Sequence, residues 1–357
     1  MIAGFYYLAA YTAAAAVGFS EKDCAGLAWA ARYTGNCTGV TIPEQTGADP
    51  DLLRAVFHYL PGDAKQIQNQ VRSGLSAEEG SRLPAALRLV CMPGGTLMDA
   101  VIQCAEQART ELLSEEQKHQ RLGIVAHIIL DACLHQGFAG VNDDLVNGAT
   151  ELKSAGTVEP ERRRQLLERT QTEALAEVFQ MKSVSQEPPV AAVGCGQVEP
   201  LINSPSAIFS YSSEWQKDLP VSCIMPIRCA GAYFVLRKVF QYIKDPRINW
   251  KSIHTDETSV LDLAAVLMGI PTEKALLVEW GEYFSWLGKD LSEQNPPPGS
   301  REKYLQNFQQ QALKLWDVVM RSSPDLRAYQ RLTEHTDSQN TRAPQQSAAK
   351  GGECIGR

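Results

Sequence analysis

The chain has 357 residues, 44% of them hydrophobic, and a formal net charge of −7. This length and apolar content can bury one large core or two modest ones, which excludes a fibrous or wholly disordered protein. The negative charge excludes a general attraction to nucleic acid, so contact with a phosphate backbone needs a local basic face. The nine cysteines form no CxxC pair, which favours reduced thiols and a cytoplasmic setting over a secreted disulfide scaffold.

The N-terminal segment, MIAGFYYLAAYTAAAAVG, has the length and the small apolar residues of a signal-peptide core, but it lacks a basic start. It passes directly into a second helix, which Ser20 and Asp23 open as a capping box and which continues through Trp29 and Tyr33. We therefore expect the segment to be a helix of the folded domain. No stretch is long and apolar enough to predict a membrane span, so we expect no membrane partner.

Helical periodicity dominates the rest of the chain, and few segments alternate as strands do. Residues 182–206 are rich in Pro, Gly and Ser and predict a long ordered loop, whereas the polar residues 333–357 predict a disordered tail. The predicted fold class is all-α, a multi-helix globular bundle. We expect a single helical domain over 1–332, whose parts 1–181 and 207–332 are joined by the loop.

Three titratable residues, His127, Asp131 and His135, interrupt the apolar run LGIVAHIILDACLHQGFAG at 122–140. Steps of four residues drift by only about 40° around a helix, so the three side chains share one face. Because the flanking residues are apolar almost all round, this face is at least partly buried. An unpaired buried polar group costs on the order of 2 kcal/mol or more, so a hydrogen-bond network, a metal ion or a substrate must satisfy the three.

The spacing of the three residues separates these interpretations in part. A rise of about 1.5 Å per residue puts His127 and His135 about 12 Å apart along the axis, too far to ligate one ion together. Asp131 can serve with either histidine, and a metal site needs a further ligand, for which His58 in FHYLPGD is the first candidate. The plainer interpretation is a satisfied polar network within a helical core.

The segments GFYYLAAY, YTGN, FHYLPGD, AHIILDACLHQGFAG and GCGQVEPLINSPSAIFSYSSEW together resemble a helical family. Its plan is similar to that of zinc-dependent phospholipase C and the single-strand nucleases, and the resemblance spans roughly residues 1–215. The resemblance implies that the metal-site residues His58, His127, Asp131 and His135 are kept. The wider pattern has a His, an Asp, a His and an Asp where this chain has Tyr6, Gly35 or Asn36, Cys195 and Asn203.

These departures bear on the metal chemistry that the resemblance implies. Replacing a carboxylate by Asn or Gly removes both charge and coordination, so we expect no hydrolytic cluster of several Zn²⁺ ions and no cofactor. The alternative is one zinc on His58, His127 and Asp131 with an open water position. Cys195 could then ligate a second ion together with His135.

By its overall character the chain is also identified as a member of the fungal arginine-containing cyclodipeptide synthases. This resemblance implies an enzyme that joins the aminoacyl groups of arginyl-tRNA and of a second aminoacyl-tRNA into a diketopiperazine. The ester of an aminoacyl-tRNA is already activated, so the reaction needs aligned amines, proton transfer and a guanidinium clamp, but no metal.

The kept residues suit such a reaction. An arginyl guanidinium entering a partly buried site needs a carboxylate, and Asp131 is the one best placed by sequence, with Asp143 and Asp144 as second choices. Cys195 is a candidate acyl acceptor. A histidine with an ordinary pKa near 6.5 can take the proton of an attacking α-ammonium. The predicted catalytic residues are His58, His127, Asp131 and His135.

A basic helix is predicted within IRCAGAYFVLRKVFQYIKDPRINWK, residues 227–251. Its apolar residues form a core stripe from Tyr233 to Ile243, which leaves the cations on the outer face and at the ends. The predicted tRNA-binding residues are Arg228, Arg237, Lys238, Lys244 and Arg247. A second cluster, ERRRQLLER at 161–169, should converge with the first if both bind tRNA; otherwise each is a solvated surface with scattered ion pairs.

The leading hypothesis is thus an aminoacyl-tRNA-dependent cyclodipeptide synthase. One alternative is a degenerate metal-dependent phosphodiester hydrolase or a non-catalytic relative of one, and another is a binding or scaffolding protein. The chain has no GxxxxGK[ST] loop, no GxGxxG after a strand and no HExxH, so nucleotide-dependent and zincin chemistry lack support.

Overall fold

The computed structural model of the chain describes residues 4–41, 50–62, 91, 93–135, 221–268, 270, 272–291 and 300–331. Over these residues the regular structure is helical, apart from one isolated antiparallel bridge between Pro61 and Cys91. The predicted all-α class is therefore confirmed. The predicted loop at 182–206 and the predicted tail at 333–357 lie outside the described residues.

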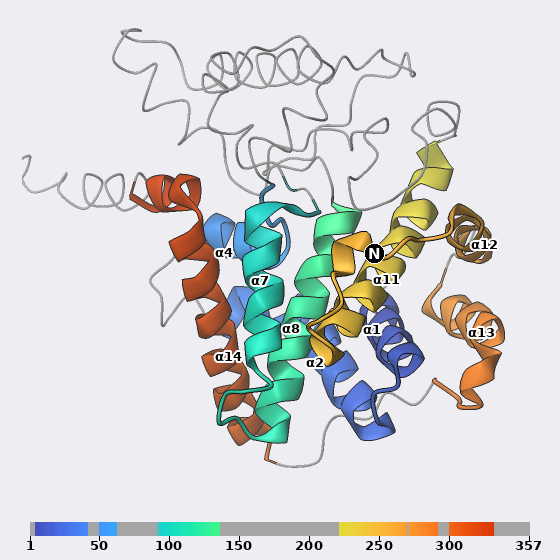
Figure 1. Ribbon diagram of the computed structural model, residues 1–357, viewed down its shortest axis with the longest axis horizontal. Helices are drawn as coiled ribbons and strands as arrows, with labels where there is room; N and C mark the ends of the chain where they lie inside the picture. Colours follow the sequence, from blue (N-terminus) through green and yellow to red (C-terminus); the bar gives the residue numbers. More distant parts are fainter. Residues whose placement is uncertain are drawn as a thin grey trace, which may run out of the picture.

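The helices follow one another in the order shown in Figure 1. They are α1 (Gly4–Val17), α2 (Glu21–Thr41), α4 (Pro50–Phe57), α7 (Gly95–Gln107), α8 (Glu115–Leu134), α11 (Val221–Lys244), α12 (Glu257–Leu267), α13 (Glu273–Tyr283) and α14 (Arg301–Ser322). Short 3₁₀ turns occur at Trp250–Ser252 and Ser285–Leu287.

The helix α8 is the centre of the bundle. It packs against α2, α11, α14, α7, α1 and α4 (Figure 1). Ser114 opens it with a capping box to Gln117, and every residue from His119 to Leu134 is buried. At Gly123 the helix meets α2 so closely that a Cβ would lie 2.4 Å from the Leu27 carbonyl oxygen. The nearly all-apolar pattern thus predicted a central helix correctly, and its polar residues are buried with it.

The helix α1 is a buried element of the domain, as expected from its continuation into α2. It packs against α2, α11, α13 and α8. Ser20 caps α2 as expected, because the Asp23 amide donates to Ser20 Oγ at 3.2 Å. The Asp23 carboxylate accepts from the Ser20 hydroxyl at 2.6 Å, whereas a full capping box would have it accept from the Ser20 backbone amide. Among the described helices, none is long and apolar enough to cross a membrane.

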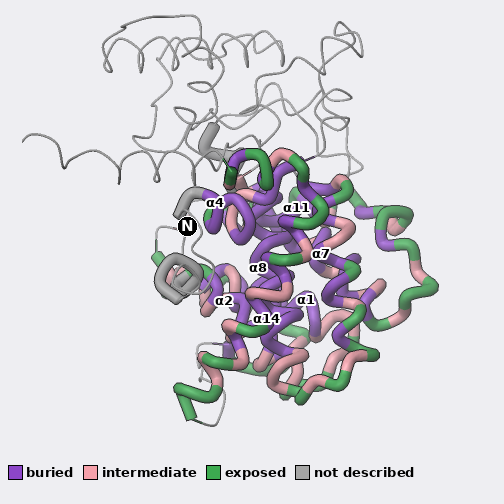
Figure 2. The backbone as a smooth tube through the Cα atoms, turned by 90° about the vertical axis from the view of Figure 1, so that its left-hand side faces the viewer, coloured by how far each residue is buried: buried purple, intermediate pink, exposed green. Residues whose placement is uncertain are grey.

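Figure 2 shows burial concentrated in α1, α2, α8 and the inner side of α11. The helices α12 and α13 pack at the side of this core. Large apolar residues are exposed here, among them Val278 on α13 and Trp286 in the turn that follows α13. Trp280 of α13 is fully buried, and its ring meets those of Phe5 and Tyr233 edge-on. The side layer is therefore anchored on α1 and α11 by aromatic packing.

Candidate active site

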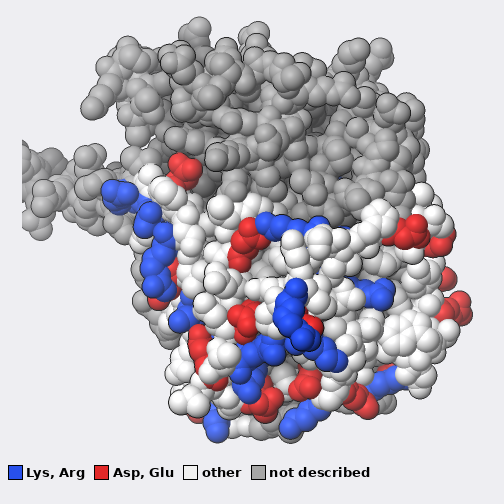
Figure 3. All heavy atoms as spheres, viewed as in Figure 1, with Lys and Arg blue, Asp and Glu red and all other residues white. Residues whose placement is uncertain are grey.

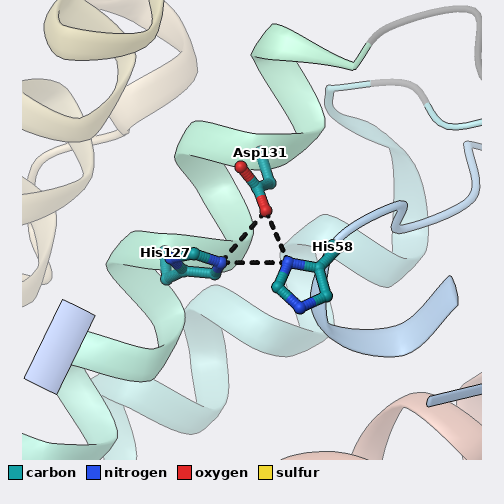
Figure 4. Close-up of side chains that lie close together, drawn as sticks. All are labelled: His58, His127 and Asp131. Carbon is teal, nitrogen blue, oxygen red and sulfur yellow. Dashed lines mark hydrogen bonds and ion pairs between the residues drawn. The ribbon is translucent and has the colours of Figure 1, made fainter. Parts of the chain in front are cut away.

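The three predicted catalytic histidines converge on the carboxylate of the fourth predicted residue, Asp131; Figure 4 shows His58 and His127 beside it. His58 Nδ1 lies 2.8 Å from Asp131 Oδ2, and His127 Nε2 lies 3.0 Å from the same oxygen. His135 Nε2 lies 3.6 Å from Asp131 Oδ1. The prediction that His58 lies beside the polar stripe of α8 is confirmed. The stripe residues act together because Asp131 stands between the two histidines, one turn from each.

His58 reaches α8 because the short helix α4 ends beside it. The apolar face of α4 is fully buried through Leu53 and Phe57, and the helix stops as the amides of His58 and Tyr59 both donate to the Arg54 carbonyl. The chain then forms the bridge from Pro61 to Cys91, whose thiol donates to the Ala132 carbonyl of α8. This path fixes the turn that carries His58 against α8.

Tyr6 of α1 is a further member of the site. Its hydroxyl donates a hydrogen bond to Asp131 Oδ1, and its ring lies 4.4 Å from the His127 ring. Gly35 of α2 lies beside the same histidine, since a Cβ at this position would stand 3.1 Å from His127 Cε1. According to the resemblance, related proteins carry a metal ligand at the positions of Tyr6 and of Gly35 or Asn36. The structure places Tyr6 and Gly35 next to the kept residues.

The charges of the site follow from its burial. Asp131 is 1% exposed and His127 is fully buried. Burial alone raises the pKa of the Asp131 carboxyl, but His127, His58 and His135 outweigh it and hold that pKa far below its usual range. Burial, followed by the charge of Asp131, raises the pKa of the Tyr6 hydroxyl well above normal. Asp131 is therefore an anion, and Tyr6 remains a donor.

His135 lies at the more open edge of the cluster, where its side chain is 30% exposed. Burial lowers its pKa, although Asp131 acts in the opposite direction. Its imidazole is therefore neutral near pH 7 and can accept a proton. The side chain of His58 is also partly accessible, since 20% of its surface is exposed, whereas only 1% of the His127 side chain is exposed. A reacting group can thus reach His135 and His58.

Three atoms of the site lie unusually close together. The edges of the triangle formed by His58 Nδ1, His127 Nε2 and Asp131 Oδ2 measure 2.8, 3.0 and 3.1 Å (Figure 4). Each of the two nitrogens carries one proton or none, and the carboxylate carries none. If both carry one, both imidazoles can donate to the same carboxylate oxygen; if one does, that group donates and the other nitrogen keeps its lone pair. The three atoms are therefore compatible both with a hydrogen-bonded cluster and with a shared cation.

The same three residues can hold one metal ion. Their donor atoms lie within 3.1 Å of one another, and ligands of a tetrahedral zinc ion stand about 3.3 Å apart, so a small outward shift of the side chains would let them hold one. This ligand set is the single-zinc alternative offered by the sequence, and it leaves a fourth position open. The other candidate group among the described residues, Asp23, Glu115 and His119, lies more than two turns along α8.

The geometry argues against Asp131 as a guanidinium clamp. Its buried carboxylate already accepts from Tyr6 and contacts His58 and His127, so an incoming guanidinium would have to break buried hydrogen bonds. Asp131 instead anchors the groups around it. Asp143, Asp144 and Cys195, the other predicted substrate-binding residues, lie outside the described part of the chain, as do Asn203 and the cluster at 161–169.

The predicted basic face of α11 is wrong at two positions. Arg228 and Lys238 are 8% and 5% exposed, and Arg228 donates to the Leu134 carbonyl at 3.1 Å, at the C-terminal end of α8. The reason is that α11 packs against α1, α7, α8 and α12, so more than one stripe of the helix is covered. A single apolar stripe does not reveal how many neighbours a helix has.

The remaining cations near the end of α11 also have structural partners. Lys244 donates to the carbonyls of Val17 and Gly18 at 2.8 and 2.7 Å, at the end of α1. Arg109 donates to the Ile243 carbonyl at 2.9 Å, at the end of α11. Arg247 forms an exposed ion pair with Asp245. Cations at helix C-termini are stabilising there, so part of this basic character is explained by the fold. On α11 the predicted members that remain open to solvent are Arg237, which is partly exposed, and Lys244, which is exposed.

Comparison with known proteins identifies one family. The model of a family of unknown function, DUF6765, matches residues 1–324, which include every described residue of the site. No curated protein and no solved structure matches the chain. The match therefore brings no activity with it, and function has to be argued from the chemistry of the site.

Proposed function

We propose that this chain, which belongs to the DUF6765 family, is an aminoacyl-tRNA-dependent cyclodipeptide synthase that makes arginine-containing diketopiperazines. The observation that supports the proposal most is the contact of Tyr6 with Asp131. A phenol donor is used here where the resembled hydrolases carry a metal-ligating histidine, and glycine stands at the position of an acid beside His127. What is left is a buried proton-transfer centre, and the ester of an aminoacyl-tRNA needs no stronger activation.

The reaction makes two peptide bonds at this centre. In each step an α-amine attacks the ester carbonyl, an N–C bond forms, the C–O bond to the tRNA ribose breaks, and the amine proton must reach the leaving oxygen. An α-ammonium with a pKa of about 7.7–8.0 needs a neutral base nearby. His135 fits this role because it is neutral and partly open. His135 itself can then give this proton to the leaving oxygen, and His58 is the second accessible imidazole.

The other residues of the cluster hold these two histidines in place. Asp131 lies within 2.8 Å of His58 and 3.6 Å of His135, so its charge orients both rings and stabilises the one that gains a proton. The Asp131 carboxylate has two further partners: the Tyr6 hydroxyl, which donates to Oδ1, and His127 Nε2, which lies 3.0 Å from Oδ2. The guanidinium clamp then has to come from another carboxylate, and Asp143 and Asp144 are the sequence candidates.

A second candidate function is phosphodiester hydrolysis with one zinc ion. The specific support is the triangle of His58, His127 and Asp131, in which three donor atoms of zinc-ligating residue types lie within 3.1 Å of one another. A bound zinc would supply a Lewis acid and an activated water. His135, which is outside the ligand set, would remain the accessible base.

The deciding experiment is expression of the chain in a bacterial host, with mass spectrometry of the medium and metal analysis of the purified protein. Cyclic dipeptides that contain arginine, lost in His135→Gln and kept in the exposed control His254→Gln, support the synthase. No cyclic dipeptide, stoichiometric zinc that is lost in His58→Gln, and hydrolysis of a phosphodiester test substrate support the second candidate. Absence of product, zinc and hydrolysis contradicts both and leaves a binding protein.

A further inference from the structure

An aromatic cleft of about 520 Å³ opens between α1, α11, α12 and the segment that follows α13. Five aromatic side chains line it: Tyr233, Phe234, Tyr283, Phe284 and Trp286. Four of these rings form a cluster around Phe284. The centroid of the Phe284 ring lies 4.8 Å from that of Tyr283, 5.1 Å from that of Tyr233 and 6.4 Å from that of Trp286. The cleft is separate from the His–Asp cluster, because its α1 residues, Ala15 and Ala16, lie about 13 Å along that helix from Tyr6.

Trp286 makes this cleft more than a part of the core. The residue is 57% exposed, whereas Phe284 beside it is 5% exposed. A large aromatic residue left half in water next to buried aromatic rings presents a flat face to a ligand. Planar rings such as nucleobases stack on faces of this kind.

Arg237 is the one charged residue of the cleft lining. Within the described part of the chain its guanidinium has no ion-pair partner. Burial, followed by the charge of Asp262, raises the pKa of Tyr283 in the cleft wall. A cation without a carboxylate, set in an aromatic wall, is available to an anionic ligand that also carries a ring.

A second cleft, of about 880 Å³, shares Ala16 with the first and continues along α11. Its lining includes Arg109, Gln241, Lys244 and the ion pair of Arg247 with Asp245. Figure 3 shows one face of the molecule, on which Lys and Arg side chains lie interspersed with Asp and Glu. From Tyr233 to Lys244 the two clefts follow about 16 Å of helix, the length of a few nucleotides of a single strand.

We propose that the α11 strip, meaning these two clefts together, binds the single-stranded 3′ end of an RNA. A base stacks against the exposed ring of Trp286, Arg237 meets its phosphate, and the next phosphates lie along Lys244 and Arg109. The last two cations also bind helix carbonyls, but each keeps further N–H donors and its full charge. The cations gather here although the chain as a whole carries −7, which favours a polyanion over an apolar partner.

This inference rests on the proposed function, for which it names the part of the tRNA that is held, yet it can be tested separately. The measurement is fluorescence anisotropy of a labelled short single-stranded RNA ending in CCA, titrated with the full chain at several salt concentrations. Trp286→Ala and Arg237→Gln should each weaken binding by about tenfold, and Arg237→Gln should lower the salt slope by about one. Arg301→Gln, an exposed arginine on α14, is the matched control and should bind as the wild type does.

The result is read together with the search for cyclic dipeptides. Wild-type affinity in both strip variants overturns the inference, even if cyclic dipeptides form. Equal binding of a double-stranded RNA or of anionic lipid vesicles also overturns it, because the strip would then act only as a charged surface. Specific RNA binding without any cyclic dipeptide supports the strip and contradicts the proposed synthase.

Discussion

The hydroxyl of Tyr6 donates a hydrogen bond to Oδ1 of Asp131, which joins α1 to α8 across 125 positions of sequence. Asp131 is buried and anionic, so this donor offsets part of the cost of removing its charge from water. The Tyr6 ring also lies 4.4 Å from the His127 ring. One residue near the N-terminus thus fixes both the carboxylate and a histidine of the site.

Tyr6→Phe should therefore impair the site more than the fold. The change keeps the ring contact with His127 and removes the donor, so we expect activity to fall at least about tenfold and the free energy of unfolding to fall by about 2 kcal/mol. Product yield and urea unfolding measure the two effects. Tyr7→Phe, on the same helix, is the matched control and should change neither. Full activity in Tyr6→Phe would show that the hydroxyl is dispensable.

Asp131→Asn should abolish product formation while the protein still folds. The amide keeps one oxygen acceptor, but the charge that orients His58 and His127 is lost, so we expect a loss of about 3 kcal/mol in the free energy of unfolding. Mass spectrometry of the product and a circular-dichroism melt give the two readings. Retained synthesis would remove Asp131 from the mechanism, whereas loss of a stoichiometric zinc would favour the hydrolase.

The pH dependence of stability follows from two lowered pKa values. His135 has its pKa lowered below 6.5 in the folded protein, and Asp131 has its own lowered below 3.8. In both cases the unfolded chain binds a proton first, so both contributions to stability are complete above the unfolded pKa and are lost as the pH falls. We expect unfolding free energy to decline gradually below pH 6.5 and again below 3.8.

The variant His135→Gln separates the contribution of His135 to this pH dependence from that of Asp131. The variant should lose the gradual decline that begins near pH 6.5, because no imidazole titrates there, and keep the decline below 3.8 that belongs to Asp131. Urea unfolding across this pH range is the measurement. An unchanged profile in His135→Gln would mean that another group carries the first decline.

The central helix and its partner could be predicted from the sequence. The run from Leu122 to Leu134 is apolar almost all round, which indicates a central helix, and FHYLPGD pointed to His58 by its resemblance. Tyr6 was recognised only as a departure from a metal-ligand pattern. Nothing in α1 distinguishes it from the neighbouring Tyr7 as the donor to Asp131, because its partner lies on another helix.

The prediction for Lys238 fails for a physical reason. The single core stripe of α11 predicts an outward Lys238, but four helices cover this helix. The guanidinium clamp at Asp131 stays a prediction, and the partners that its carboxylate already has come from α1 and from the end of α4. Periodicity shows which side of a helix is apolar, whereas the satisfaction of a polar group depends on tertiary neighbours.

The last prediction separates the two arginines of α11. Arg228 is buried and donates to the Leu134 carbonyl, so Arg228→Met leaves a carbonyl unsatisfied at the end of α8, beside the site. We expect a loss of about 2 kcal/mol in the free energy of unfolding and an unchanged affinity and salt slope for single-stranded RNA.

Arg237→Gln should behave in the opposite way. Its side chain is partly exposed in the aromatic cleft, so the substitution should leave the free energy of unfolding within about 0.5 kcal/mol of the wild type. RNA affinity should fall about tenfold. Thermal melts and anisotropy titrations of the two variants side by side test the pair. If Arg228→Met alone weakened RNA binding in folded protein, the buried cation would be part of the RNA site and the α11 strip would be misplaced.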